Sequence, residues 1–156
     1  MRVTICAVGR LRKSPELDLV NDYLDRFGKA GRGMGLGPAS ILEVEDKKNL
    51  GMEAEAVLIE RALPSGAVVV TLDERGSVMS SPEFADKIAG WRDAGRSELA
   101  FIIGGADGIA PALRAKADFS ISFGRMVWPH MLVRVMLAEQ IYRAGQILAG
   151  TPYHRV

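Results

Sequence analysis

The sequence predicts an α/β protein with a mainly parallel five-stranded sheet and helices on both faces. Five short, β-rich apolar runs alternate with longer segments whose apolar residues recur at helical spacing. No hairpin turn separates consecutive runs, so the strands are expected to be parallel and joined by right-handed crossovers. With 156 residues, the chain is expected to form one domain around one core.

The expected strands are the five apolar runs, which cover Arg2 to Val8, Ala39 to Val44, Ala67 to Leu72, Leu99 to Ile103 and Asp118 to Phe123. The third run is continuous, which is typical of a strand buried on both faces, and a turn at Asp73 to Gly76 is expected to close it.

The expected helices are bounded by caps and breakers. Ser14 and Pro15 predict a helix start, with an apolar stripe that ends at Gly28. Ser81-Pro82-Glu83 predicts another start, and a short helix is expected within Ile109 to Ala117. The helix between the second and third strands is expected to bury Ala54, Val57, Leu58 and Ala62. Met131 to Leu148 has little polar surface, which predicts burial against the core or a partner.

A glycine-rich stretch connects the first helix to the second strand. Glycine occupies five of the eleven positions from Gly28 to Pro38. The spacing never matches G-x-G-x-x-G, and the stretch follows a helix instead of a strand. We therefore expect a mobile loop and not a phosphate cradle.

Composition is that of a globular protein, with 48% apolar and 25% charged residues. No apolar run is long enough to span a membrane and no signal peptide is evident, so a cytoplasmic location without a membrane partner is expected. The single cysteine, Cys6, excludes a disulfide framework or a thiolate metal cluster, and no metal is expected. We interpret Cys6 as a buried small hydrophobe.

Charge is unevenly distributed. The net charge is only +1, but the residues from Ile109 onward hold six basic and two acidic side chains. Such a basic C-terminal third could receive an anionic partner, although solvated surface charge also explains it.

Candidate ligand-binding segments follow three of the expected strands. They are Leu72 to Gly76, Gly104 to Gly108 and Phe123 to Trp128. Ligands bind beyond the carboxyl ends of parallel strands, where such loops converge. The alternative is that the glycines only form tight turns.

Several motifs together resemble the RlmH family of small SPOUT-class methyltransferases. They are Ile103-Gly104-Gly105-Ala106-Asp107-Gly108, Trp128-Pro129-His130, Leu132-Val133-Arg134, Glu139-Gln140, Tyr142-Arg143-Ala144 and the ending Pro152-Tyr153-His154-Arg155. The resemblance covers the whole chain, although Trp128 and the glycine-rich stretch differ from the family's usual residues.

The resemblance implies a C-terminal trefoil knot, a homodimer and S-adenosyl-L-methionine as cofactor. It also implies methylation of N3 of a pseudouridine in large-subunit ribosomal RNA, in the ribosome, with no role for DNA. Carried over by position, the cofactor-binding residues are Leu72, Gly104, Phe123, Gly124, Arg125, Met126, Val127 and Trp128.

The expected catalytic residues lie near the C-terminus. His154 is either a general base or a phosphate contact, and Arg143 or Arg155 is an electrostatic partner for the developing oxygen charge. Tyr153 is expected to stack on a base or ribose. Arg134 and Arg143 could instead pair with acids, and Glu139 has the i,i+4 spacing for Arg143.

Two other functions stay open at this point. A non-catalytic ribosome-binding or assembly module could keep the same fold. A flavodoxin-like nucleotide or phosphate binder is disfavoured because Gly9 to Lys13, after the first strand, holds no Ser or Thr.

Overall fold

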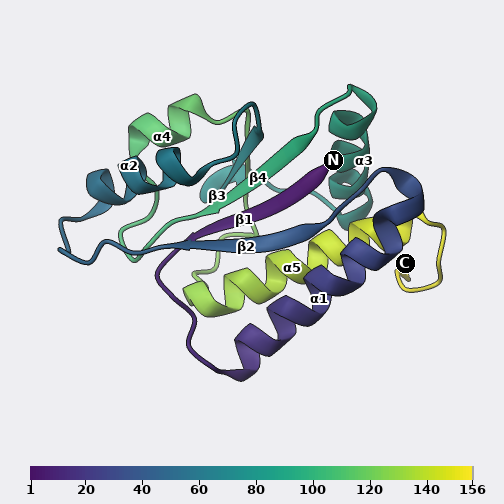
Figure 1. Ribbon diagram of the computed structural model, residues 1–156, viewed down its shortest axis with the longest axis horizontal. Coiled ribbons are helices and arrows are strands. Elements are labelled where there is room, and N and C mark those ends of the chain that lie inside the picture. The colour runs from purple at the N-terminus through teal and green to yellow at the C-terminus, as the bar shows by residue number, and fades with distance from the viewer. Residues whose placement is uncertain (156) are drawn as a thin grey trace.

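A computed structural model describes residues 1–155 and contains a five-stranded parallel sheet (Figure 1). The strand order is β2-β1-β4-β3-β5. Their bounds are β1 Arg2–Val8, β2 Ala39–Val44, β3 Val68–Ser77, β4 Glu98–Ile103 and β5 Phe119–Ile121. All four strand pairs are parallel, which confirms the predicted class.

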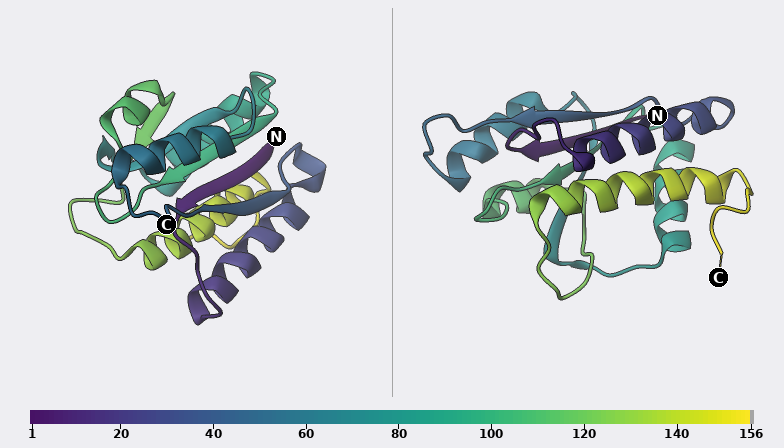
Figure 2. Two further views of the ribbon diagram at one scale, coloured as in Figure 1. Left: turned by 60° about the vertical axis from the view of Figure 1, so that its left-hand side comes forward. Right: turned by 90° about the horizontal axis from the view of Figure 1, so that it is seen from below.

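Helices cover both faces of the sheet (Figure 2). One face carries α1 Pro15–Gly31, α3 Ser81–Asp93 and α5 His130–Leu148, and the other carries α2 Met52–Ala62 and α4 Pro111–Lys116. Alternate residues of β1 point to opposite faces. Ile5 therefore belongs to the larger core cluster with α1, α3 and α5, and Cys6 to the smaller one with α2 and α4. Burial of Cys6 raises the pKa of its thiol to about 11, so it is a hydrophobe, as predicted.

Local caps define where two helices begin. The Ser14 hydroxyl accepts a hydrogen bond from the Leu17 amide at 3.2 Å, which starts α1 as predicted. For α3 the cap is Ser80, one residue before the predicted start. Ser80 and Glu83 form a reciprocal capping box.

The predicted end of α1 at Gly28 is wrong. The helix continues to Gly31 and is followed by the 3-10 helix η1, Arg32–Met34. Gly28 instead serves a tertiary contact, because a Cβ on Gly37 would come within 3.1 Å of its Cα.

The predicted mobile loop from Gly28 to Pro38 is also wrong. Leu36 is buried in the core, and its amide donates to the Gly31 carbonyl at 3.1 Å. The Gly37 amide donates to the Met1 carbonyl at 2.9 Å, which ties the segment to the start of β1.

Strand β3 runs past Leu72, where a turn was predicted, and ends at Ser77. Ser77 pairs with Ile121 of β5 after a register shift. This pairing brings Gly76 so close to Ile121 that a Cβ would lie 2.6 Å from the Ile121 carbonyl carbon. The Ser122 amide also donates to the Ser77 carbonyl at 3.0 Å. The segment that leads to α3 therefore lies side by side with the segment that leads to α5. The implied knot stays a prediction.

The predicted inner face of α2 is partly wrong. Val57 is 47% exposed, whereas Ala56 and Ile59 are buried against the sheet. The predicted burial of the last helix, α5, is confirmed for Leu137 and Ile141, which lie in the core between α1 and α3. Within residues 1–155, no helix combines the length and apolar character needed to cross a bilayer.

Candidate functional site

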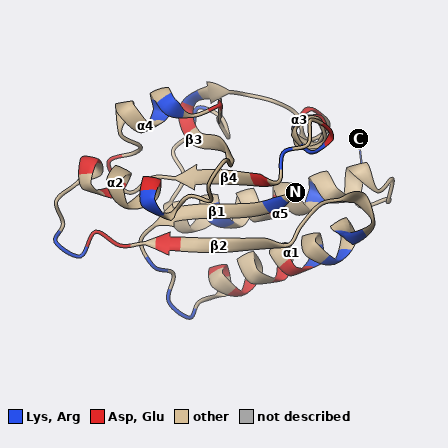
Figure 3. Cartoon of the chain, turned by 45° about the horizontal axis from the view of Figure 1, so that its top comes forward, with Lys and Arg blue, Asp and Glu red and all other residues tan. Residues whose placement is uncertain are grey.

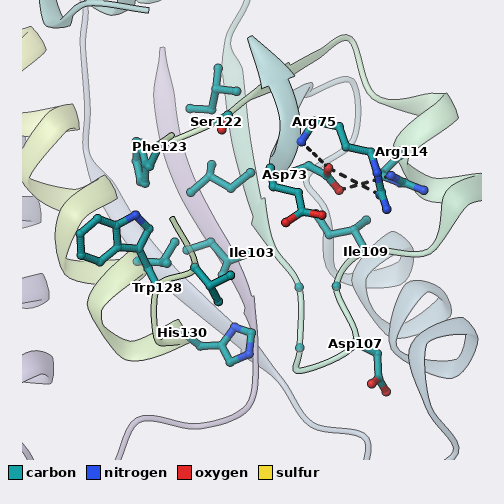
Figure 4. Close-up of a pocket in the computed structure, with 18 of the residues that line it drawn as sticks. Asp73, Arg75, Ile103, Asp107, Ile109, Arg114, Ser122, Phe123, Trp128 and His130 are labelled. Carbon is teal, nitrogen blue, oxygen red and sulfur yellow. Dashed lines mark hydrogen bonds and ion pairs between the residues drawn. The ribbon is translucent and has the colours of Figure 1, made fainter. Parts of the chain in front are cut away.

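A cavity of about 520 Å³ opens at the ends of β4 and β5 and beside residues 72–75 of β3 (Figure 4). Its walls come mainly from residues 72–75, 103–109, 121–124 and 126–128. The three segments predicted to converge at this edge of the sheet therefore do so. The reason is that parallel strands place all their carboxyl ends at one edge.

The structure brings together nearly all the residues predicted to hold a cofactor. The cavity is lined by Leu72, Gly104, Phe123, Gly124, Met126, Val127 and Trp128. Arg125 is exposed and is not among the lining residues. That these residues bind a cofactor stays a prediction.

Glycines shape the loop that follows β4. The Gly108 amide donates to the Gly105 carbonyl at 3.0 Å, and the two residues form an isolated bridge. A Cβ on Gly104 would lie 2.6 Å from the Gly108 carbonyl oxygen, closer than packed atoms allow. Gly104 is thus required for the loop to fold back on itself beside the cavity.

The cavity has one apolar and one charged side. Figure 4 shows Phe123 and Trp128 on one side and Asp73, Arg75 and Arg114 on the other. An Asp73 oxygen lies 3.5 Å from an Arg114 terminal nitrogen, and the other accepts the Arg75 amide at 2.9 Å. The Asp73 side chain is only 9% exposed.

The cavity fits a nucleoside-sized ligand. Its volume lies in the usual range for small-molecule sites, and apolar surface predominates beside a few polar groups. Backbone of the glycine segments can approach a ligand closely because no side chain intervenes.

A second group of candidate residues surrounds Glu139. Its Oε1 accepts hydrogen bonds from Arg143 Nη2 at 2.6 Å, Arg143 Nε at 3.0 Å and the Tyr153 hydroxyl at 3.0 Å. His154 Nδ1 lies 3.3 Å from Arg143 Nη1. We call Glu139, Arg143, Tyr153 and His154 the tail cluster. Arg155 is exposed beside it in sequence.

Protonation in the tail cluster follows from these contacts. Arginine only donates, so the contact with Arg143 requires His154 Nδ1 to accept and assigns the ring proton to Nε2. Burial, followed by the hydrogen bond to Glu139, raises the pKa of Tyr153 to about 12. Tyr153 is therefore a neutral donor at physiological pH. Hydrogen bonding to Glu139 raises the pKa of Arg143.

One chain does not bring the tail cluster to the cavity. His130, the first residue of α5, lines the cavity, whereas Arg143 lies thirteen residues further along the same helix. At 1.5 Å per residue, these positions are about 20 Å apart. Figure 1 shows the C-terminus at the far end of α5 from the strand ends.

The basic C-terminal third does not form one patch. Arg134 is buried and pairs with Glu43 at 2.9 Å, while its other nitrogen donates to the Val8 and Gly9 carbonyls. Arg114 lies at the cavity and Arg143 in the tail cluster. In Figure 3, elements such as α1 carry both signs of charge. Arg134 and Arg143 thus both pair with acids, the alternative that the sequence left open.

The sequence places Asp73 and Arg75 in the candidate segment from Leu72 to Gly76, and both line the cavity. Sequence reasoning missed Arg114, which it counted only as part of a basic region. Nothing local indicated that Arg114 lies beside Asp73.

Comparison with known proteins shows the family of this chain. Residues 1–154 match the family described as "Predicted SPOUT methyltransferase". Proteins called "Ribosomal RNA large subunit methyltransferase H" are 71% identical in Ruegeria pomeroyi, 70% in Ruegeria sp. (strain TM1040) and 69% in Dinoroseobacter shibae. Each similarity extends over 156 residues and covers all of both chains. The resemblance inferred from the sequence is confirmed.

Proposed function

This chain belongs to the SPOUT methyltransferase family, and from that premise we propose that it methylates N3 of a pseudouridine in large-subunit ribosomal RNA, with S-adenosyl-L-methionine as donor. The observation that carries the proposal is the cavity at the ends of β4 and β5 and beside β3. Its lining includes residues of two of the family motifs, Ile103 to Gly108 and Trp128-Pro129-His130.

The cavity would hold the donor through backbone and apolar groups. Gly104 and residues 123–128 would supply backbone donors and acceptors for the adenine edge, and Leu72 and Trp128 would cover its faces. When bound, the donor supplies a methyl group carried on a positively charged sulfur. The protein's task is then to align the attacking nitrogen and to exclude competing water.

The tail cluster would manage the proton and the charge on the nucleophile. N3 of pseudouridine carries a proton that must leave before or during attack. His154 Nδ1 is the unprotonated nitrogen and could take it after Arg143 turns toward the substrate. Arg143 or Arg155 would then stabilise the resulting oxygen charge. Tyr153, which stays neutral, would stack or donate but would not act as a base.

A homodimer would join the two groups. The distance of about 20 Å along α5 prevents one chain's tail cluster from reaching its own cavity. Large apolar side chains are exposed at the mouth of the cavity and the start of α5, namely Met126, Val127, Met131 and Leu132. In the dimer that we propose, a second copy covers this surface, and its tail cluster completes the site.

The RNA would be recognised as part of a large shaped target. A net charge of +1 provides little non-specific attraction to phosphate. The proposed substrate is therefore the assembled ribosome in the cytoplasm and not free RNA.

S-Adenosyl-L-methionine with a labelled methyl group allows a direct test of the proposal. Ribosomes that lack the modification should incorporate methyl groups at one pseudouridine when incubated with the protein, and free ribosomal RNA should incorporate far fewer. Mapping the methylated nucleotide by mass spectrometry identifies the position. Binding to ribosomes without any transfer would instead support the non-catalytic assembly module.

A further inference from the structure

The charged side of the cavity suggests how the donor is oriented. Asp73 follows the buried part of β3, Arg114 belongs to α4, and both side chains line the cavity. Within residues 1–155, the buried Arg114 Nε has no hydrogen-bond partner. We propose that Asp73 and Arg114 together bind the charged amino-acid end of the methyl donor, an inference that rests on the proposed function.

The contact between the two side chains is too loose to satisfy Arg114. Arg114 Nη1 and Asp73 Oδ2 are 3.5 Å apart, whereas a charge-assisted hydrogen bond is about 2.7–2.9 Å long. A guanidinium has five N–H donors in a planar fork that matches a carboxylate. The Arg114 side chain is 26% exposed and lines the cavity, so a ligand carboxylate can reach it.

The charges match those of an amino-acid zwitterion. Such a group carries an ammonium and a carboxylate two bonds apart on one carbon. Asp73 and Arg114 present the opposite signs next to each other, so the ammonium would face Asp73 and the carboxylate Arg114. Arg75 donates its amide to Asp73 and helps to hold this carboxylate in place.

The cavity as a whole is also suited to the charge of the donor. Its lining contains Asp73, Glu74 and Asp107 against Arg75 and Arg114, a formal charge of −1. The sulfonium and the zwitterion together give the donor a charge of +1. The apolar side at Phe123 and Trp128, opposite the charged pair in Figure 4, is then free for the flat adenine.

Truncated ligands separate this role from a purely structural one. 5′-Methylthioadenosine has the adenosine and the sulfur but lacks the amino-acid end. S-Adenosylhomocysteine keeps the amino-acid end and lacks only the methyl group and its charge. Binding of all three ligands to the purified full-length protein can be measured by isothermal titration calorimetry.

Arg114→Met should weaken binding of S-adenosylmethionine and S-adenosylhomocysteine by about tenfold to a hundredfold, the range for a lost charged hydrogen bond. Methylthioadenosine should bind within about twofold of its wild-type affinity, because it makes no contact with Arg114. Asp73→Asn should show the same selectivity. Arg114→Lys, which keeps the charge but not the fork, should have an intermediate effect and serves if Arg114→Met does not fold.

Lys116→Met is the matched control. Lys116 lies on the same short helix, pairs with Glu60 at 2.8 Å and does not line the cavity. Its replacement should leave binding of all three ligands unchanged, and thermal unfolding followed by circular dichroism checks the fold of each variant.

Equal weakening of all three ligands in Arg114→Met, or no weakening, would overturn the inference and leave the proposed function intact. Selective weakening in a protein that methylates no ribosomal RNA would refute the proposed function alone. A wild-type protein that binds none of the ligands would refute both.

Discussion

The cavity at the strand ends and the tail cluster at the end of α5 are built in opposite ways. The cavity owes its shape to backbone and to apolar walls: a Cβ on Gly104 would collide with the Gly108 carbonyl, and Gly124 has a φ of +105° that favours glycine. The tail cluster owes its shape to one carboxylate, Glu139, that accepts hydrogen bonds from Arg143 and Tyr153. In the proposed function, the cavity would hold a ligand by shape, and the tail cluster would present groups that take a proton and stabilise charge.

Two arginines of α5, Arg134 and Arg143, also differ in their surroundings. Arg134, near the cavity, has a side chain only 4% exposed and bonds to Glu43 and two carbonyls. Arg143, in the tail cluster, has a side chain 25% exposed and bonds to Glu139 one turn away. We infer that the first arginine serves the fold and the second serves the reaction.

Removal of residues 152–156 should have the largest effect and should affect the reaction alone. Without Tyr153 and His154, methyl transfer to ribosomes should fall by about a thousandfold or more, as for loss of a general base and its partners. The donor should bind within about twofold of wild type, because the cavity lies at the other end of α5. Calorimetry and single-turnover transfer of labelled methyl groups measure the two quantities. Unchanged turnover would remove the tail cluster from the mechanism.

Gly104→Val should have the converse effect. A Cβ there would lie 2.6 Å from the Gly108 carbonyl oxygen, so the loop must move, and donor affinity should fall by at least about a hundredfold. The matched control is Gly90→Ala on α3, where a Cβ meets no atom within 4 Å. Donor binding that survives Gly104→Val would contradict the assignment of this loop.

Mixing the two inactive proteins sharpens the comparison. If a site combines the cavity of one copy with the tail cluster of another, a hybrid dimer of the truncated chain and Gly104→Val has one intact site. Transfer activity should therefore return in part on mixing. No recovery in a sample that native mass spectrometry shows to contain hybrid dimers would argue against a shared site.

Replacement of the two arginines of α5 should lower the free energy of unfolding by different amounts. Arg134→Met removes a buried guanidinium that pairs with the half-buried Glu43 and donates to the Val8 and Gly9 carbonyls, and it should lower the free energy of unfolding by about 3–5 kcal/mol. Arg143→Met should lower it by no more than about 1 kcal/mol, since its pair with Glu139 is a half-buried i,i+4 contact within one helix, while it reduces methyl transfer strongly. Urea denaturation of both variants tests this. Similar losses of stability would contradict the division of roles.

The smallest effect is a shift in one tyrosine titration. The pKa of Tyr153 is raised to about 12, so the folded protein holds this proton more tightly than the unfolded chain, whose pKa is about 10. The associated stability is present below pH 10 and is lost as pH rises from about 10 to 12. Tyrosinate absorbance should show one late step that Tyr153→Phe removes and Glu139→Gln moves to lower pH. Three tyrosines that ionise together near pH 10 would contradict the contact.

Much of this architecture could be predicted because its causes are local. The apolar run Arg2 to Val8 and the cap at Ser14 depend on neighbouring residues, and both were placed correctly. The convergence of the three cavity segments also followed, because it depends only on parallel strands. The roles of the glycines were predicted less well. Gly28 has the appearance of a helix terminator, but it lies inside α1 and lets Gly37 approach closely, a contact that no local pattern reveals.

The type and order of the helices and strands, and the edge of the sheet where the cavity opens, can thus be predicted from residue type and spacing. Both of these act over only a few positions of the chain. The partners of charged side chains cannot be predicted in this way, since Arg134 meets Glu43 across 91 residues and Arg114 meets Asp73 across 41. Nor can the contacts of Tyr153 with Glu139 and of His154 with Arg143, which depend on how the chain turns back after α5. These contacts can be seen only in the folded chain. A buried charged side chain pairs with whichever opposite charge lies near it in space, however far away that residue is in the sequence.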